Sequence, residues 1–128
     1  MTKYADVSAS DFPLIRVTFT GEAPTVENFT FYLQEVKESY NQQQKIVLLF
    51  DATKAVFPGT NFQKQQADWI KENTVLMRTY CLGTAYVIPN ILIRNVLKAI
   101  FAFQKQPVPY TISSTAVEAE NWLQNQFK

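Results

Sequence analysis

The sequence predicts an α/β fold, with a mixed, mostly parallel sheet of about five strands and four helices. Segments with strand patterns alternate with segments of helical periodicity along the chain. Two of the expected strands, residues 46–51 and 81–88, are apolar almost throughout, as is typical of strands covered on both faces. Right-handed crossovers would place the parallel strands in one sheet, so we expect one domain over residues 1–128.

The N-terminal part is expected to hold two strands and one helix. Residues 4–8 suit a short first strand, and residues 14–20 alternate between apolar and polar side chains, as in a half-exposed strand near a sheet edge. Gly21 and Pro24 interrupt the chain, and Thr25 is placed to cap the helix. The apolar residues at helical spacing are Phe29, Leu33, Val36 and Tyr40.

The middle of the chain contains the central strand, residues 46–51, which ends in Asp51. After Pro58 and Gly59, Thr60 is placed to cap a second helix that reaches about Met77. The apolar stripe of this helix is thin, so one side of it should face solvent. The strand of residues 81–88 follows and is stopped by a proline.

Asn90 is placed to cap a third and strongly apolar helix, residues 91–105. Its expected core line is Leu92, Val96, Ile100 and Phe103, flanked by Ile93 and Leu97. The face opposite that line carries Arg94, Lys98, Phe101 and Lys105 at spacings of i, i+4, i+7 and i+11.

The C-terminal part predicts an edge strand and a last helix. Pro109 lies in the strand of residues 108–113 and removes a hydrogen-bond donor, which favours an edge position. Residues 115–118 have the Thr-x-x-Glu pattern of a capping box. The helix that they open should bury Ala119 and Leu123, and in one interpretation also Trp122.

Composition argues against several functional classes. Twelve basic and 11 acidic residues give a net charge of +1, so we expect no nucleic-acid partner. The chain has no histidine and three widely separated glycines, so we expect no enzyme, metal site or nucleotide cofactor. Cys81 is the only cysteine, and it predicts a buried thiol in a reducing compartment. Without a signal-peptide pattern or a long apolar run, we expect a cytoplasmic protein with no transmembrane segment.

Four segments carry a family resemblance. They are Phe19-Thr20-Gly21-Glu22, Thr25 at the start of the first helix, Leu49-Phe50-Asp51, and Glu118-Ala119-Glu120-Asn121-Trp122-Leu123. Together they resemble the bacterial SpoIIAA-like proteins, which are grouped with STAS domains and, by fold, with the lipid-binding CRAL-TRIO (Sec14) domains. The resemblance covers essentially the whole chain. It implies a SpoIIAA-like fold and a role in signalling or protein binding.

STAS antagonists of anti-sigma factors are similar in having an Asp-Ser-Ser-Gly segment after the central strand, in which one serine is phosphorylated. Aligned by register, this segment falls on Pro58-Gly59-Thr60-Asn61. Gly59 stands where the hydroxyl would be expected, which leaves Thr60 as the candidate for phosphorylation. The favoured alternative is that Thr60 only caps the second helix.

The segment after Asp51 is the expected functional edge, because ligands of open α/β sheets bind beyond the carboxyl ends of the strands. Asp51 could serve as an isolated functional carboxylate, or it could hold its own loop by accepting backbone hydrogen bonds in the Asp-Ala-Thr turn. Phe57, Phe62 and Trp69 could line a pocket for an apolar ligand, or Phe62 and Trp69 could pack in the core.

The basic and aromatic face of the third helix, formed by Arg94, Lys98, Phe101 and Lys105, suits an anionic membrane surface, an acidic partner or the contact of a homodimer. The alternative is a solvated face with Phe101 turned into the core. Taken together, the sequence favours a non-catalytic, cytoplasmic, STAS-like module that binds a protein partner through residues 51–60 and the second helix. The alternative function is a carrier of a small apolar or lipid-like ligand.

Overall fold

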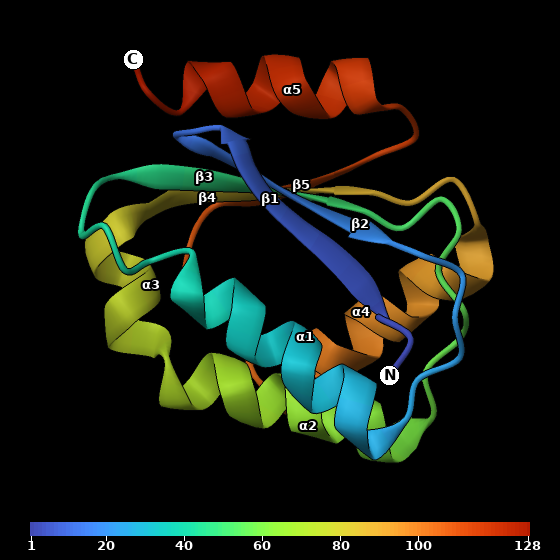
Figure 1. Ribbon diagram of the computed structural model, residues 1–128. Helices are drawn as coiled ribbons and strands as arrows, with labels where there is room; N and C mark the ends of the chain where they lie inside the picture. Colours follow the sequence, from blue (N-terminus) through green and yellow to red (C-terminus); the bar gives the residue numbers. More distant parts are fainter.

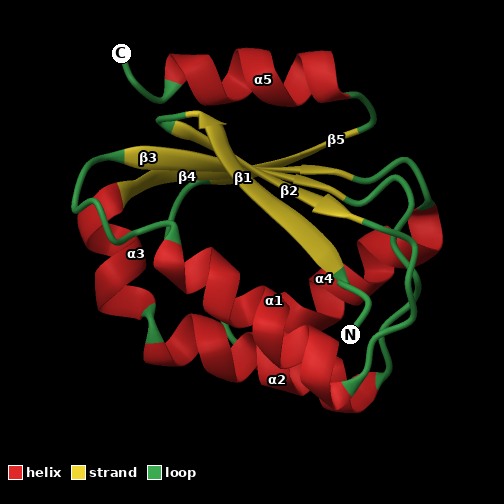
Figure 2. Cartoon of the chain, viewed as in Figure 1, coloured by secondary structure: helices red, strands yellow, loops and turns green.

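The computed structural model describes residues 1–128 and shows one five-stranded sheet with helices on both faces (Figure 1, Figure 2). The strands lie side by side in chain order, and they are β1 (Ala5–Asp11), β2 (Leu14–Phe19), β3 (Ile46–Asp51), β4 (Cys81–Val87) and β5 (Tyr110–Ser113). β1 is antiparallel to β2, and every other neighbouring pair is parallel. The predicted α/β class and the mixed, mostly parallel sheet are therefore confirmed.

The helices cover the two faces of the sheet unequally (Figure 1). They are α1 (Val26–Glu38), α2 (Thr60–Glu72), α3 (Thr74–Tyr80), α4 (Ile91–Phe103) and α5 (Ala116–Asn125). The first four lie on one face, and α5 alone lies across the other. This leaves a thick helical layer on one side, in which a site between helices and sheet can form.

The second predicted helix is two helices, so the chain has five rather than four. Asn73 leaves the helical conformation between them, with φ −109° and ψ 17°. Its side-chain amide donates to the carbonyl of Trp69 at 2.8 Å, and the hydroxyl of Thr74 donates to the carbonyl of Ile70 at 2.8 Å. The carbonyl of Trp69 also keeps its backbone hydrogen bond from the N–H of Asn73 at 3.0 Å, so the two side chains add hydrogen bonds at the end of α2.

Three of the predicted helix caps are confirmed. The hydroxyl of Thr25 accepts from the backbone N–H of Asn28, whose side chain in turn accepts from the N–H of Thr25. Asn90 and Thr115 cap α4 and α5 in the same way, by accepting a backbone N–H of the first turn. These caps fix where three of the helices begin.

The prediction that Thr60 caps α2 is wrong. Gly59 occupies the cap position in an extended conformation (φ −67°, ψ 172°), and no side chain caps the helix. Thr60 is the first helical residue, and its side chain is exposed. The cap falls one residue earlier than expected because glycine is also tolerated there, so the hydroxyl pattern was a misleading signal.

β3 is covered on both faces, as its unbroken apolar run predicts. Ile46, Leu48 and Phe50 belong to the large core beneath α1, α2 and α4, whereas Val47 and Leu49 belong to a smaller core beneath α5. All five are buried. The strand therefore contributes to both cores.

The core line predicted for α4 is partly wrong. Val96 and Ile100 are buried as expected, but Leu92 is 62% and Phe103 54% exposed. The inward side instead includes Ile93 and Leu97, which pack against the large core. The exposed side of the helix runs through Asn95, Lys98 and Ala102, and Leu92 and Phe103 lie at the margin of that side. The predicted line was therefore rotated away from the side that faces the sheet.

α5 lies unusually close to β4 at Gly83. A Cβ atom added there would lie 3.1 Å from the indole ring of Trp122 and 3.1 Å from Cγ of Gln126. Trp122 is partly buried and packs against the small core. Because Gly83 has no side chain, α5 can pack this closely against β4.

We expect Gly83→Ala to lower the free energy of unfolding by about 1–3 kcal/mol through overpacking, measured by urea denaturation. Replacing Trp122 by leucine should remove most of that loss in the double variant. Gly59→Ala is the control, because nothing lies within 4 Å of its added Cβ. Alanine at Gly59 is a poorer helix cap, which lowers stability, but it also restricts the unfolded chain, which raises stability. The free energy of unfolding should therefore change by less than about 0.5 kcal/mol. Equal losses at both glycines would contradict the close-packing argument.

Candidate functional site

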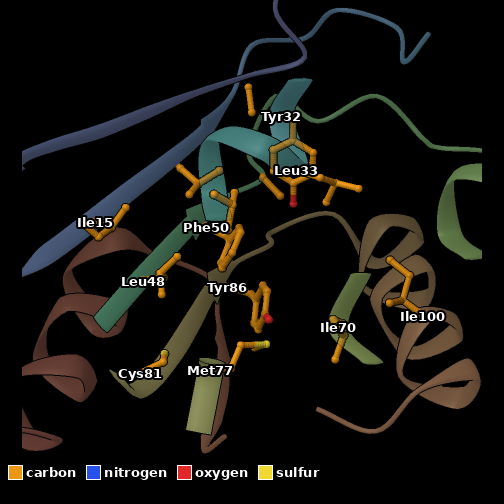
Figure 3. Packing of buried hydrophobic residues seen from close by; sticks show 14 of the residues in the cluster. Ile15, Tyr32, Leu33, Leu48, Phe50, Ile70, Met77, Cys81, Tyr86 and Ile100 are labelled. Atoms are coloured by element: carbon orange, nitrogen blue, oxygen red, sulfur yellow. The ribbon is translucent and has the colours of Figure 1, made fainter. Parts of the chain in front are cut away.

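An apolar cavity of about 90 Å³ lies between the sheet and the helical layer formed by α1, α2 and α4. Of its 18 lining residues, 16 are hydrophobic. Figure 3 shows part of the surrounding core, with Phe50 and Tyr86 projecting from the strands toward Ile70 of α2 and Ile100 of α4. The aromatic residues that line the cavity are Tyr4, Phe19, Phe29, Tyr32, Phe50, Phe62, Tyr86 and Phe101.

The cavity lies near the carboxyl ends of β3 and β4. Ala52, Ala55 and Pro58, from the segment that follows β3, line it together with Ile88, which follows β4. This is the edge of the sheet at which ligands of α/β proteins bind. The predicted functional edge therefore does border a cavity, although most of the cavity wall comes from other parts of the chain.

Rigid aromatic contacts shape the walls. Tyr4, Phe29 and Tyr32 surround one another with ring centroids 5.3–5.6 Å apart. On the strand side, Phe50 and Tyr86 stack with centroids 5.1 Å apart and planes inclined by 17°. Rings change shape little when they pack, so they hold a space open where flexible aliphatic chains would fill it.

The polar groups of the cavity wall are neutral. None of the lining residues is Asp, Glu, Lys or Arg. The hydroxyl of Tyr32 donates to Oε1 of Gln66 at 3.0 Å, and the hydroxyl of Tyr86 accepts from Nε2 of Gln106 at 2.7 Å. The hydroxyl of Tyr4 is 3.5 Å from the carbonyl of Val56, which is too long for a strong hydrogen bond.

Burial keeps these phenols protonated. It raises the pKa of Tyr4 to about 12, and it raises the pKa of Tyr32 and of Tyr86 well above the ordinary value. The titratable groups of the wall are these three phenols, which do not act as bases near neutral pH.

The buried amide of Gln106 is only partly satisfied. Gln106 is 7% exposed and follows α4. Its Nε2 donates to Tyr86, but its Oε1 has no hydrogen-bond partner. A buried amide with a free oxygen lowers stability, which is a known feature of functional sites.

Alkaline titration tests the burial of the phenols. Burial raises the pKa of four tyrosines, Tyr4, Tyr32, Tyr40 and Tyr86, whereas the chain has six. A tyrosine whose pKa is raised by folding contributes stability that is fully present below the pKa of the unfolded chain, near 10. This contribution is lost as the pH rises through the pKa of the folded protein, which is about 12 for Tyr4. We expect phenolate absorbance to report at most two ionisations in the folded protein near pH 10. All six should titrate together in denaturant, and six in the folded protein would contradict the buried arrangement.

Asp51 holds its own loop. One carboxylate oxygen, Oδ1, accepts from the backbone N–H of Thr53 at 3.0 Å and from its hydroxyl at 2.6 Å. These are the hydrogen bonds of an Asp-Ala-Thr turn, which is the structural alternative considered above. Asp51 is half-buried at the end of β3, and it does not line the cavity.

The structure does not bring the predicted aromatic residues together. Phe62 lines the cavity, but Phe57 is 57% exposed in the preceding loop. Trp69 is partly buried against the large core and does not line the cavity. Thr60 is exposed in the first turn of α2, so its hydroxyl is accessible.

The basic and aromatic face predicted on the third helix is not one surface. Arg94 is half-buried and donates to the carbonyl of Ile88 at 2.6 Å and to the hydroxyl of Ser114 at 2.9 Å. Phe101 points the other way, into the cavity wall, and Lys105 lies beyond the end of α4. Of these four residues, Lys98 is the only one that lies within α4 with an exposed side chain.

Sequence reasoning missed most of the polar groups at the cavity. Gln66 lies in a polar stretch of α2 and looks like its glutamine neighbours, and Tyr32 looks like one more residue of an amphipathic helix. The one available signal was Tyr86, a polar aromatic residue within an apolar interior strand, because such a hydroxyl needs a buried partner.

The structure holds no group of three or more His, Cys, Asp or Glu side chains arranged to bind a metal ion. It also has no helix long and apolar enough to cross a membrane. A scan against models of protein families found no match, and searches of curated proteins and of solved structures found none either. The class that the fold and site define is an α/β domain with an apolar cavity beneath its helices.

Proposed function

We propose that this protein binds a small apolar ligand in the cavity and serves as its carrier. The observation that carries the proposal is the cavity itself, which is open between rigid rings and has no charged side chain in its wall. Apolar pockets with few convergent polar groups are the usual form of small-molecule sites. This reverses the order of the two functions that the sequence favours, because the cavity supplies a specific binding place.

The size of the cavity limits the ligand. A volume of about 90 Å³ is well below the roughly 300–1,000 Å³ of sites for drug-sized molecules. It is closer to an engineered cavity of about 150 Å³ that holds benzene. We therefore propose a ligand of about one ring rather than a whole lipid.

The chemistry of the wall supports binding without catalysis. Its ionisable groups are phenols whose pKa is raised by burial, as for Tyr4, Tyr32 and Tyr86. Protonated phenols can donate hydrogen bonds, but they do not take up protons near neutral pH. A non-enzymatic role is thus part of the proposal.

The SpoIIAA-like family, with its STAS and Sec14 relatives, remains our proposed assignment, together with a cytoplasmic location. The support for the family is the mixed, mostly parallel sheet with its helical layer and the motifs quoted above. The apolar cavity adds to the likeness with ligand-binding members of that group.

Filling the cavity should abolish binding. Ala52 is buried and lines the cavity, so leucine at this position would occupy part of the space. We expect native mass spectrometry of the protein purified gently from its host to show a small-molecule adduct, and Ala52→Leu to lose it. Toluene at a hundredfold excess over its Kd should stabilise the wild type by about 2.7 kcal/mol and leave Ala52→Leu unchanged.

Ala102→Leu is the matched control, because Ala102 is exposed on α4 and does not line the cavity. It should keep both the adduct and the stabilisation. The proposal would fail if wild-type protein carried no adduct and gained no stability from toluene. It would also fail if Ala52→Leu responded like the wild type while remaining folded.

A second candidate is the STAS-like module that binds a protein partner through residues 51–60 and α2. It is favoured by the exposure of Phe57, at 57%, in a loop held at its start by the Asp51 turn. Exposed aromatic residues are common anchors of protein interfaces. Phosphorylation of the exposed Thr60 belongs to this candidate, since the start of a helix favours added negative charge.

Pull-down from a lysate of the host tests the second candidate. Phe57→Ala should lose the specific partner, because truncating an interface anchor weakens binding by about 2 kcal/mol or more. Val75→Ala is the control, as Val75 is 79% exposed on α3, away from this loop. An unchanged set of partners in Phe57→Ala and Thr60→Ala would contradict the interface. Intact-mass analysis would show whether Thr60 carries a phosphate.

A further inference from the structure

We infer that the cavity selects a neutral single-ring ligand with one hydroxyl group, recognised by Tyr32 of α1 and Gln66 of α2. This inference rests on the proposed ligand-binding function and names the chemical class of the ligand. Its basis is a hydrogen-bonded pair of polar side chains in a wall that is mostly hydrophobic and carries no charged residue. Phenol is the simplest molecule of this class.

The wall disfavours charged ligands. With no Asp, Glu, Lys or Arg among the lining residues, no opposite charge is available to offset the desolvation of an ion. A carboxylate such as benzoate would lose its hydration and gain no ion pair. A neutral molecule has no ionic hydration to lose, so the ligand should be uncharged at neutral pH.

Tyr32 and Gln66 leave hydrogen-bonding capacity unused. Tyr32 is 4% exposed and donates its proton to Oε1 of Gln66 at 3.0 Å, which holds the amide in place. Nε2 of Gln66 makes no hydrogen bond within the protein, and the Tyr32 oxygen can still accept one. A ligand hydroxyl can accept from the amide and donate to the phenol oxygen, so it matches both groups at once.

The other glutamines of this part of α2 have their amides engaged elsewhere. Gln63 donates from Nε2 to the carbonyl of Pro58 at 2.8 Å, and Gln65 donates from Nε2 to the hydroxyl of Thr30 at 3.1 Å. Neither residue lines the cavity. Gln66 is thus the only one of the three placed to address a ligand there.

The rings of the wall favour an aromatic ligand of matching size. Phe29 and Phe62 approach each other with centroids 5.1 Å apart, and Tyr86 meets Phe101 edge to face at 5.9 Å. The walls therefore present both ring edges and ring faces to the cavity. An aromatic ligand can make edge-to-face and offset stacked contacts with them, which aromatic rings prefer.

The experiment compares phenol with toluene, which has a methyl group in place of the hydroxyl. Dissociation constants are measured by NMR titration for wild type, Gln66→Leu, Tyr32→Phe and Gln65→Leu. We expect Gln66→Leu and Tyr32→Phe to weaken phenol binding about tenfold, as for one lost hydrogen bond, and to leave toluene unchanged. Gln65→Leu removes an α1–α2 hydrogen bond outside the cavity and should change neither ligand.

The outcomes separate this inference from the proposed function. If toluene binds but neither variant changes the ratio of phenol to toluene affinity, the polar recognition is wrong while the apolar site stands. If benzoate binds the wild type as tightly as phenol, the restriction to neutral ligands is wrong. If neither phenol nor toluene binds the wild type, the proposed function fails as well. Should Gln66→Leu not fold, Tyr32→Phe decides, because it removes a single oxygen atom.

Discussion

The burial of β3 on both faces is the constraint on which the rest of the structure depends. Its side chains alternate between two cores, so the chain must supply helices to both sides of the sheet. One face receives four helices and the other receives only α5, which fits because Gly83 allows Trp122 to approach β4 closely. On the face with four helices, the side chains do not fill all the space between the helices and the sheet. The cavity lies there, between aromatic rings.

The sheet and most helices could be predicted because each is specified by local chemistry. Two runs that are apolar almost throughout defined interior strands, and Thr25, Asn90 and Thr115 marked helix starts through hydrogen bonds made within one turn. The errors have the same local origin. At Asn73 a polar residue divides a helix although no proline or glycine marks the break. In α4 the predicted core line included Leu92 and Phe103, which are apolar by sequence but exposed in the fold.

The candidate site was less predictable, because its residues meet only in the folded chain. The sequence predicted a functional edge at the carboxyl end of β3, which borders the cavity, and it offered the Asp51 turn that the structure contains. It could not show that Tyr32 and Gln66, 34 residues apart, bond across two helices. Nor could it show that Phe101, spaced with Arg94 and Lys98, turns away from them into the cavity wall. Spacing defines faces of one element, whereas a site depends on how elements face one another.

Three polar side chains that line the cavity or contact its wall have incomplete hydrogen bonding within the protein. Tyr4 has only a long contact with Val56, Gln106 keeps an amide oxygen without a partner beside Tyr86, and Nε2 of the partly exposed Gln66 makes no hydrogen bond within the protein. Phenylalanine in place of these tyrosines would bury a similar area without demanding hydrogen bonds, so the hydroxyls are not explained by packing. Proteins tend to break local rules of this kind where function requires it. Free donors and acceptors beside an apolar space are what a ligand with one polar group would satisfy.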